Sequence, residues 1–289
     1  MEDIEQRAVR YKHEAIKKLS SKSFLQSLFG TNKTDQAIDY YQRSGNLFKM
    51  LKNWKEASYV FSEAAELQVK IGNEYDAGNS FVNAANCSKK YDLEKAIYYL
   101  FRAIEIYASL GKFATAAKYH KTIAELYHEN QEIEKALKQY EQAAEYYKNE
   151  DNLCAAKACL IIVAEQNALR EDYAKAIQLF EQVADYELNS NLLKYSAKDR
   201  FFQAALCQLC LDDAQVPRMI EKFNIKCPFF GGSREEGFIN LLCKSIECNN
   251  LEEFNFQVKT YDSVSKFSTW YISVLLKIKR RIEGVIDLK

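Results

Sequence analysis

Four segments of the chain repeat the same spacing of small and bulky residues, and this repeat constrains the fold more than any other feature. The segments begin at Trp54, Leu93, Ile133 and Tyr173 and align without a gap. In each, an alanine is followed four residues later by a bulky apolar residue and seven residues later by a small one. Such offsets fall on one face of an α-helix. The alanines are Ala57, Ala96, Ala136 and Ala176, the bulky residues are Phe61, Leu100, Tyr140 and Phe180, and the small residues are Ala64, Ala103, Ala143 and Val183.

A second series of predicted helices lies between these segments, and its alanines occur in pairs eight residues apart. The repeating unit is then a helix, a turn and a second helix of about 40 residues, which is longer than the usual 34-residue tetratricopeptide unit. The sequence therefore predicts an all-α fold, a tetratricopeptide-like α-α superhelix built as a twisted sheet of helical hairpins. The alanine pairs are Ala77 and Ala85, Ala116 and Ala124, Ala156 and Ala164, and Ala197 and Ala205.

The repeat fades beyond about residue 213, where the only two prolines of the chain, Pro217 and Pro228, interrupt the helical pattern. Three further helical segments follow, and we expect a C-terminal helical bundle that covers the last apolar face of the array. Three regions are predicted: an N-terminal helix with an apolar membrane-attachment loop at 1–34, the hairpin array at 35–213, and the bundle with its tail at 214–289.

The last predicted helix has an apolar face and a basic end. Cations from Lys277 to Arg281 occupy its predicted last turns, where they complement the helix dipole. Gly284 is a natural helix end, so a short tail is predicted to follow it, either as a docking peptide or as a frayed terminus. The apolar face consists of Trp270, Tyr271, Val274, Leu275, Ile278 and Ile282.

Charge and cysteine content exclude several classes of function. Forty basic and forty acidic residues cancel, so no nucleic-acid partner is expected. The first residues resemble no targeting signal, and eight cysteines then indicate reduced thiols in a cytoplasmic protein. Cys207 and Cys210 form a CxxC within an apolar helical segment, and they are predicted to be core thiols. Because no catalytic or phosphate-binding motif occurs, we expect no enzyme, no metal and no cofactor.

The predicted loop between the first two helices carries four large apolar residues. Lys22 and Lys33 flank it. The apolar residues either pack against the first hairpin or form a shallow anchor for a membrane or partner, with the cations facing anionic lipid. They are Phe24, Leu25, Leu28 and Phe29.

Three lysines recur at equivalent places in the repeat. Lys118, Lys157 and Lys198 each follow an aligned alanine by one or two residues. We predict that they form a basic stripe along one side of the array, suited to a long acidic rod, although each lysine taken alone fits an ordinary solvated surface.

Several ordered segments give the chain a more specific resemblance. They are SFLQSLFG, FKMLKNWKEA, RAIEIYASLGKFATAAKYH, LLKYSAKD, FFQAALCQLCLD, YDSVSK and TWYISVLLKIKRRIEG. In this order and over nearly the whole length, the chain resembles the alpha-SNAP family of soluble NSF attachment proteins, with the alpha and beta forms both compatible.

The resemblance implies an adaptor that binds the four-helix SNARE bundle and recruits the hexameric ATPase NSF for SNARE disassembly, in contact with membranes as a peripheral protein. It places SNARE-facing cations at Lys112, Lys118, Lys198 and Arg234, with Lys157 one residue away from a further such position. It places NSF-facing residues at Asp212, Glu247, Asp287 and Leu288, and a membrane-attachment loop at Phe24, Leu25, Leu28 and Phe29. A generic tetratricopeptide-like adaptor that captures short peptides is the alternative.

Overall fold

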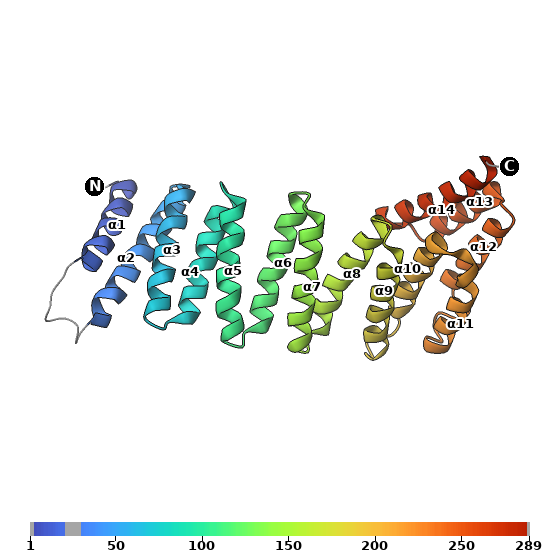
Figure 1. Cartoon of the computed structure of the whole chain (residues 1–289), viewed down its shortest axis with the longest axis horizontal. Helices are drawn as coiled ribbons and strands as arrows, with labels where there is room; N and C mark the ends of the chain where they lie inside the picture. Colours follow the sequence, from blue (N-terminus) through green and yellow to red (C-terminus); the bar gives the residue numbers. More distant parts are fainter. Residues whose placement is uncertain (1–2, 21–29, 288–289) are drawn as a thin grey trace. The chain divides into compact units, whose positions relative to one another are not determined.

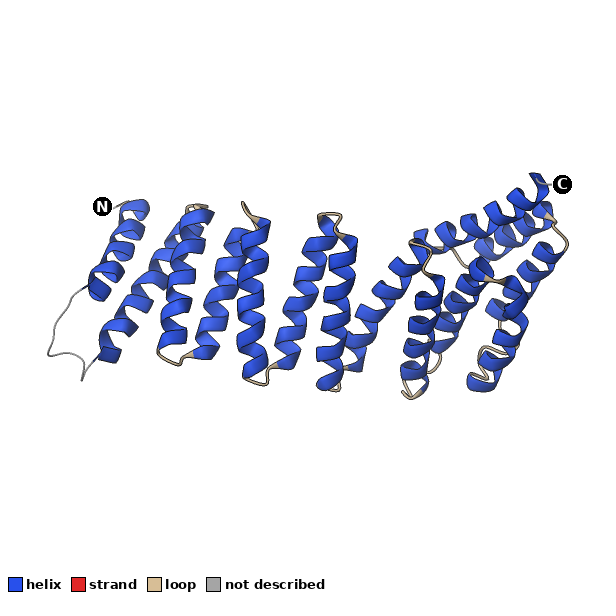
Figure 2. Cartoon of the chain, viewed as in Figure 1, coloured by secondary structure: helices blue, strands red, loops and turns tan. Residues whose placement is uncertain are grey.

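The computed structural model describes residues 3–20 and 30–287, and the regular elements in these residues are all helical (Figure 2). In the same residues, no helix combines the length and the hydropathy needed to cross a membrane. The contacts of the chain group into two compact units, residues 1–152 and residues 153–289, which are called unit 1 and unit 2 below.

Unit 1 is a row of antiparallel helices in which each helix packs against the next along the chain (Figure 1). This nearest-neighbour arrangement is what a helical hairpin repeat predicts. The helices are α1 (Ile4–Ser20), α2 (Gly30–Met50), α3 (Trp54–Lys70), α4 (Glu74–Ser88), α5 (Leu93–Ser109), α6 (Phe113–Glu129) and α7 (Ile133–Asn149).

The alanines of the repeat lie where the helices cross. All the predicted alanines of both series are completely buried, and the bulky residues beside them are buried as well. An alanine at a crossing allows two backbones to approach closely while neighbouring large side chains fill the space around them. The predicted all-α hairpin fold is therefore confirmed.

Two glycines of unit 1 leave no room for a side chain. A Cβ atom added to Gly78 in α4 would lie 2.9 Å from the ring of Tyr107 in α5, and one added to Gly45 would lie 2.7 Å from the ring of Phe61. Tyr107 has no room to move, because it is 1% exposed and its hydroxyl donates to Asn79 Oδ1 at 2.9 Å. Glycine is thus required at 78 for packing.

Unit 2 begins with three helices, each packed against the next, and ends in a bundle of further helices. One apolar core runs through it, from Ala164 in α8 to Ile282 in α14. This core extends across residue 213, and the predicted domain boundary there remains a prediction. The elements are α8 (Leu153–Leu169), α9 (Tyr173–Leu188), α10 (Ala197–Leu211), the short 3₁₀ helix η2 (Asp213–Gln215), α11 (Val216–Lys226), α12 (Arg234–Glu247), α13 (Leu251–Val264) and α14 (Thr269–Asp287).

Helix α14 packs its predicted apolar face into this core. Trp270, Val274, Leu275, Ile278 and Ile282 are buried, as predicted. The indole of Trp270 also donates from Nε1 to the carbonyl oxygen of Glu165 in α8, at 3.0 Å. The C-terminal helix is consequently a structural partner of α8 and α10 and not an appendage.

Two predictions about α14 are wrong. The helix does not end at Gly284 but continues to Asp287, because a single glycine near a helix end costs only about 1 kcal/mol relative to alanine. The cations are therefore not in its last turn. Two of them reach other helices instead. Lys277 donates to the carbonyl of Leu169 at 2.8 Å, and Arg281 donates to the carbonyl of Cys210 at 3.0 Å.

Candidate protein-interaction surfaces

The predicted SNARE-facing cations of unit 1 lie at the start of α6 and within it. Lys112 is the residue that precedes the helix, and its side chain makes no capping hydrogen bond there. Lys118 lies further along the same helix, and both lysines are exposed. They are available to an anionic partner. Whether they continue into one stripe with the cations of unit 2 remains a prediction.

The predicted cation at Lys157 has a partner within unit 2. Its ammonium lies 2.9 Å from Glu187 Oε1, and this ion pair joins α8 to α9. The side chain of Lys157 is 19% exposed and that of Glu187 only 3%. The other carboxylate oxygen of Glu187 is buried without a hydrogen-bond partner among the described residues. Lys157 thus forms the ion pair that compensates this nearly buried carboxylate.

Lys198 is held in the same way. Its ammonium lies 3.0 Å from Glu235 Oε1, joining α10 to α12, and Glu235 Oε2 has no hydrogen-bond partner in the described residues. Burial acts to raise the pKa of Glu235, but the hydrogen bond from Lys198 and the backbone hydrogen bond at the start of α12 outweigh it and lower the pKa. This carboxylate is therefore ionised at neutral pH.

Arg234 directly precedes Glu235, the residue that pairs with Lys198. The predicted cations Arg234 and Lys198 are therefore brought to the same part of unit 2. The Arg234 guanidinium is exposed, donates from Nη2 to Ser265 Oγ at 2.7 Å, and lies 5.3 Å from the ring centre of Tyr261. These contacts hold the guanidinium against α13 while leaving donors for an anion.

A third carboxylate, that of Asp199, interacts with the Lys198–Glu235 pair and with Glu187. Burial raises the pKa of Asp199, which also feels the charges of Arg200, Lys198, Glu235 and Glu187. The cluster so defined is Lys157, Glu187, Lys198, Asp199, Arg200 and Glu235, in which three cations face three carboxylates. Within this cluster the formal charges of cations and carboxylates therefore balance before any partner binds.

Sequence reasoning missed these carboxylates. Glu187 and Glu235 lie 30 and 37 residues from their lysines, so no local spacing reveals the pairs. The one available signal is that Glu187 occupies a helix face that is otherwise apolar, which marks a charge in need of a partner.

The predicted NSF-facing acids lie at one end of unit 2. Asp212 is half-buried and accepts from the backbone amide of Ala214 at 3.1 Å and from Gln215 Nε2 at 2.8 Å. Glu247 is exposed at the end of α12. The side chain of Asp287 and the whole of Leu288 lie outside the described residues, so these two assignments remain predictions.

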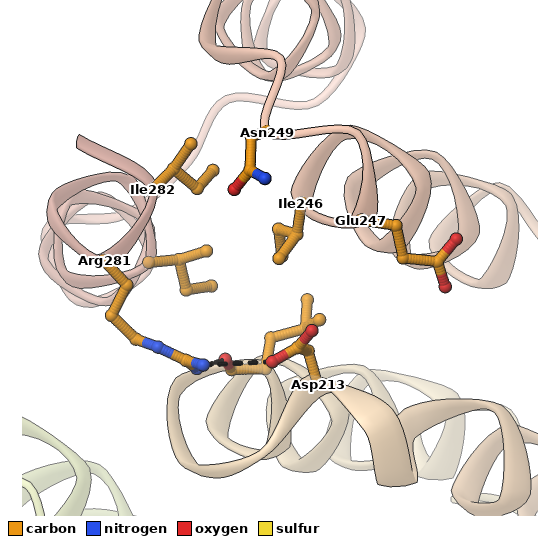
Figure 3. A pocket seen from close by; sticks show the side chains of 8 residues that line it. Asp213, Ile246, Glu247, Asn249, Arg281 and Ile282 are labelled. Carbon is orange, nitrogen blue, oxygen red and sulfur yellow. Dashed lines mark hydrogen bonds and ion pairs between the residues drawn. The ribbon is translucent and has the colours of Figure 1, made fainter. Parts of the chain in front are cut away.

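A cavity of about 280 Å³ lies at this end of unit 2 (Figure 3). Arg281 and Asp213 form an ion pair at 3.0 Å on one side, while Glu247 lies on the opposite side with its carboxylate directed away. Apolar side chains including Ile246 and Ile282 line the floor. Asp213 is thereby paired with a cation, whereas Glu247 is exposed to solvent.

The predicted membrane-attachment residues Phe24, Leu25, Leu28 and Phe29 lie outside the described residues, and their role remains a prediction. The two core thiols are confirmed, because Cys207 is completely buried and Cys210 is 8% exposed. Burial raises the pKa of Cys210 to about 11, so this thiol is protonated at neutral pH.

Comparison with known proteins agrees with this architecture. The family model for soluble NSF attachment protein, SNAP, matches residues 6–283. The chain is 43% identical to human alpha-soluble NSF attachment protein over 274 residues, covering 94% of this chain and 93% of the human protein. It is 43% identical to bovine beta-soluble NSF attachment protein, covering 97% and 95%. A fowlpox virus homologue is 34% identical, covering 97% and 99%. A match of this extent, on a helical repeat of the predicted kind, places the chain in the soluble NSF attachment protein family.

Proposed function

We propose that this chain is an adaptor that binds assembled SNARE complexes and recruits and stimulates the ATPase NSF, which disassembles them in vesicle fusion and intracellular transport. The observation that carries the proposal is the match to the soluble NSF attachment protein family over residues 6–283. ATP hydrolysis belongs to NSF, and this chain contributes binding surfaces only. The protein then works in the cytoplasm, in peripheral contact with membranes.

The surfaces support a division of labour within this function. Exposed cations at Lys112, Lys118 and Arg234 face the SNARE bundle, whose acidic surface they complement. Lys157 and Lys198 contribute as well. Lys157 leaves Glu187, Lys198 leaves Glu235, and each then pairs with a carboxylate of the SNARE bundle. At the far end of unit 2, Glu247 and Asp212 contact NSF, together with Asp287 and Leu288.

A reconstituted disassembly assay tests the proposal. A pre-assembled SNARE complex, NSF and ATP are mixed with and without the purified chain, and the loss of the complex is followed over time. We expect disassembly, and retention of NSF on the immobilised complex, only when the chain is present. If the chain neither retains NSF nor speeds disassembly, the adaptor function is wrong. Binding to a short peptide terminus in place of the folded bundle would favour the generic peptide-binding adaptor.

The basic surface has its own test. Lys118→Glu should weaken binding to the SNARE complex, and the loss should shrink at high salt because exposed charges are screened. Lys138→Glu is the matched control, since Lys138 is equally an exposed lysine of unit 1, on α7. Equal effects of the two variants would remove Lys118 from the binding surface.

The apolar loop is tested by comparing two substrates. Phe24→Ser with Leu28→Ser should reduce disassembly of SNARE complexes anchored in liposomes and leave soluble complexes almost unaffected, because a shallow membrane anchor acts only where a bilayer is present. An equal loss on both substrates would assign the loop to packing.

A further inference from the structure

A basic cavity lies in unit 1, and its lining includes none of the cations assigned above. It has a volume of about 310 Å³ and is lined by residues of α1, α3 and α5 and of the turn before α5. The lining contains three lysines, three tyrosines and one glutamate. The lining residues are Lys12, Lys55, Glu56, Tyr59, Tyr91, Lys95 and Tyr99.

The three lysines come from three different helices. Lys12 lies on α1, Lys55 in the first turn of α3, and Lys95 in the first turn of α5. The three lysines therefore offer three separate positive charges around one cavity. A ligand that uses them together must carry several negative groups on a compact frame.

Two of these lysines occupy positions that helix stability disfavours. The amino end of a helix carries a partial positive charge, so a cation in the first turn costs about 0.3–1 kcal/mol where an acidic residue would gain a similar amount. Lys55 and Lys95 both lie in such first turns. Their placement raises the positive potential of the cavity, at a cost to the helix ends that is common at binding sites.

The one lining carboxylate does not neutralise the cavity. Glu56 accepts from Lys12 at 2.8 Å, and the ammonium of Lys12 also lies 4.9 Å from the ring centre of Tyr59. Lys95 is 4.0 Å from Asp92, whose other oxygen accepts from the Lys95 backbone amide as the cap of α5. The Lys55 side chain is exposed. Lys12 is therefore fixed in orientation, and Lys55 and Lys95 have donors for a ligand.

The tyrosines complete a site with hydroxyl donors as well as ammonium groups. Tyr59 and Tyr91 are 44% and 41% exposed, and Tyr99 is half-buried. Phosphate groups accept several hydrogen bonds each and are bound by lysine as a point charge. A cavity of about 310 Å³ is of the size that holds a small ligand such as a compact ring with several phosphates.

From these contacts we propose that unit 1 binds a compact polyphosphorylated ligand, of the chemical class of an inositol polyphosphate, in the cavity between Lys12, Lys55 and Lys95. Such a ligand exists both free and as the headgroup of a phosphoinositide lipid, and the same ammonium and hydroxyl groups recognise either. This site is separate from the lysines assigned to SNARE binding.

Titration calorimetry with inositol hexakisphosphate and co-sedimentation with vesicles containing phosphatidylinositol 4,5-bisphosphate test the proposal on the full chain. We expect binding in at least one of the two experiments. The variant K55Q/K95Q should weaken it by roughly tenfold or more, since a hydrogen bond to a charged group contributes about 1.5–3 kcal/mol. Binding in calorimetry alone identifies a free ligand, and strong binding to vesicles alone identifies a lipid headgroup.

The matched control is K70Q/K138Q, which removes the same charge from two other exposed lysines of unit 1. It should leave affinity unchanged. The proposal is overturned if neither probe binds, or if the control variant weakens binding as much as K55Q/K95Q does. Both pairs of lysines are exposed, and circular dichroism of each variant verifies that the helices are intact. SNARE disassembly by K55Q/K95Q should remain normal, which separates this site from the proposed adaptor function.

Discussion

Lys198 and Glu235 form an ion pair of 3.0 Å between α10 and α12, and the second oxygen of the Glu235 carboxylate is buried without a partner among the described residues. A lysine that is to bind an external acid must first leave this carboxylate. Glu235 is therefore an internal competitor of the partner that Lys198 is proposed to bind, and Glu187 stands in the same relation to Lys157.

Replacing these carboxylates should strengthen binding to the SNARE complex. Glu235→Gln keeps the shape of the side chain but removes the charge, so Lys198 is released and the affinity should rise by roughly two- to tenfold. Titration of the purified variant against a SNARE complex at low salt measures this rise. Glu221→Gln is the control, because Glu221 is an exposed acid on α11. An equal gain in the control would attribute the effect to net charge alone.

Asp199 should make unit 2 less stable at neutral pH than at acidic pH. Burial raises the pKa of Asp199, so the folded state holds this proton more tightly than the unfolded state does. The protonated Asp199 contributes its full stabilising free energy below the ordinary aspartate pKa of about 3.9. That contribution is lost as the pH rises through the higher pKa that Asp199 has in the folded state. Asp199→Asn, which cannot ionise, should remove this loss of folding stability at neutral pH.

Thermal unfolding of the two proteins across a pH series measures the effect. The variant should melt at a higher temperature at pH 7, and the difference should disappear toward acidic pH. Glu235 contributes with the opposite sign, since its lowered pKa gives stability that is lost on acidification. Only the difference between variant and parent therefore isolates Asp199. A variant that is less stable at pH 7 would contradict the prediction.

Arg281 should stabilise unit 2 by capping α10. It donates to the carbonyls of Leu209 and Cys210 and pairs with Asp213 at 3.0 Å, at the end of α10 where a cation complements the helix dipole. Arg281→Gln should lower the free energy of unfolding by about 1–3 kcal/mol, as measured by urea denaturation. Arg280→Gln, at the neighbouring exposed position, should change it by less than about 0.5 kcal/mol. If the two variants were equally stable, the cap would have no energetic role.

Two glycine substitutions should act in opposite directions. Gly78→Ala places a Cβ 2.9 Å from the immobile ring of Tyr107 and should destabilise unit 1 by about 1–3 kcal/mol. Gly237→Ala on α12 meets no atom within 4 Å and should stabilise unit 2 by about 0.5–1 kcal/mol, because alanine favours the helix. The melting temperatures of the two variants and of the parent measure these changes in stability. A Gly78→Ala protein as stable as the parent would show that the Tyr107 ring can move.

The hairpin array was predictable because its signal is local. Alanines such as Ala57 and Ala96 recur on one helix face, and all that is needed to read them is the period of the helix. The end of α14 was not predicted correctly, since Gly284 favours termination only weakly. The partners of Lys157, Lys198 and Arg281 could not be predicted either. They depend on which helices the folded chain brings together over tens of residues, and the sequence contains no local pattern for that.

The position of α14 has a consequence for the order in which the chain is made. Lys277 binds the carbonyl of Leu169, and Arg281 binds those of Leu209 and Cys210. During synthesis, α8 and α10 leave the ribosome before Lys277 and Arg281 have been added to the chain. Unit 1 has contacts between successive helices and can assemble while it emerges, whereas the ends of α8 and α10 lack these partners until α14 has been synthesised. A transcript truncated before α14 should therefore yield a product that quality-control proteases remove, even though every earlier helix is encoded in full.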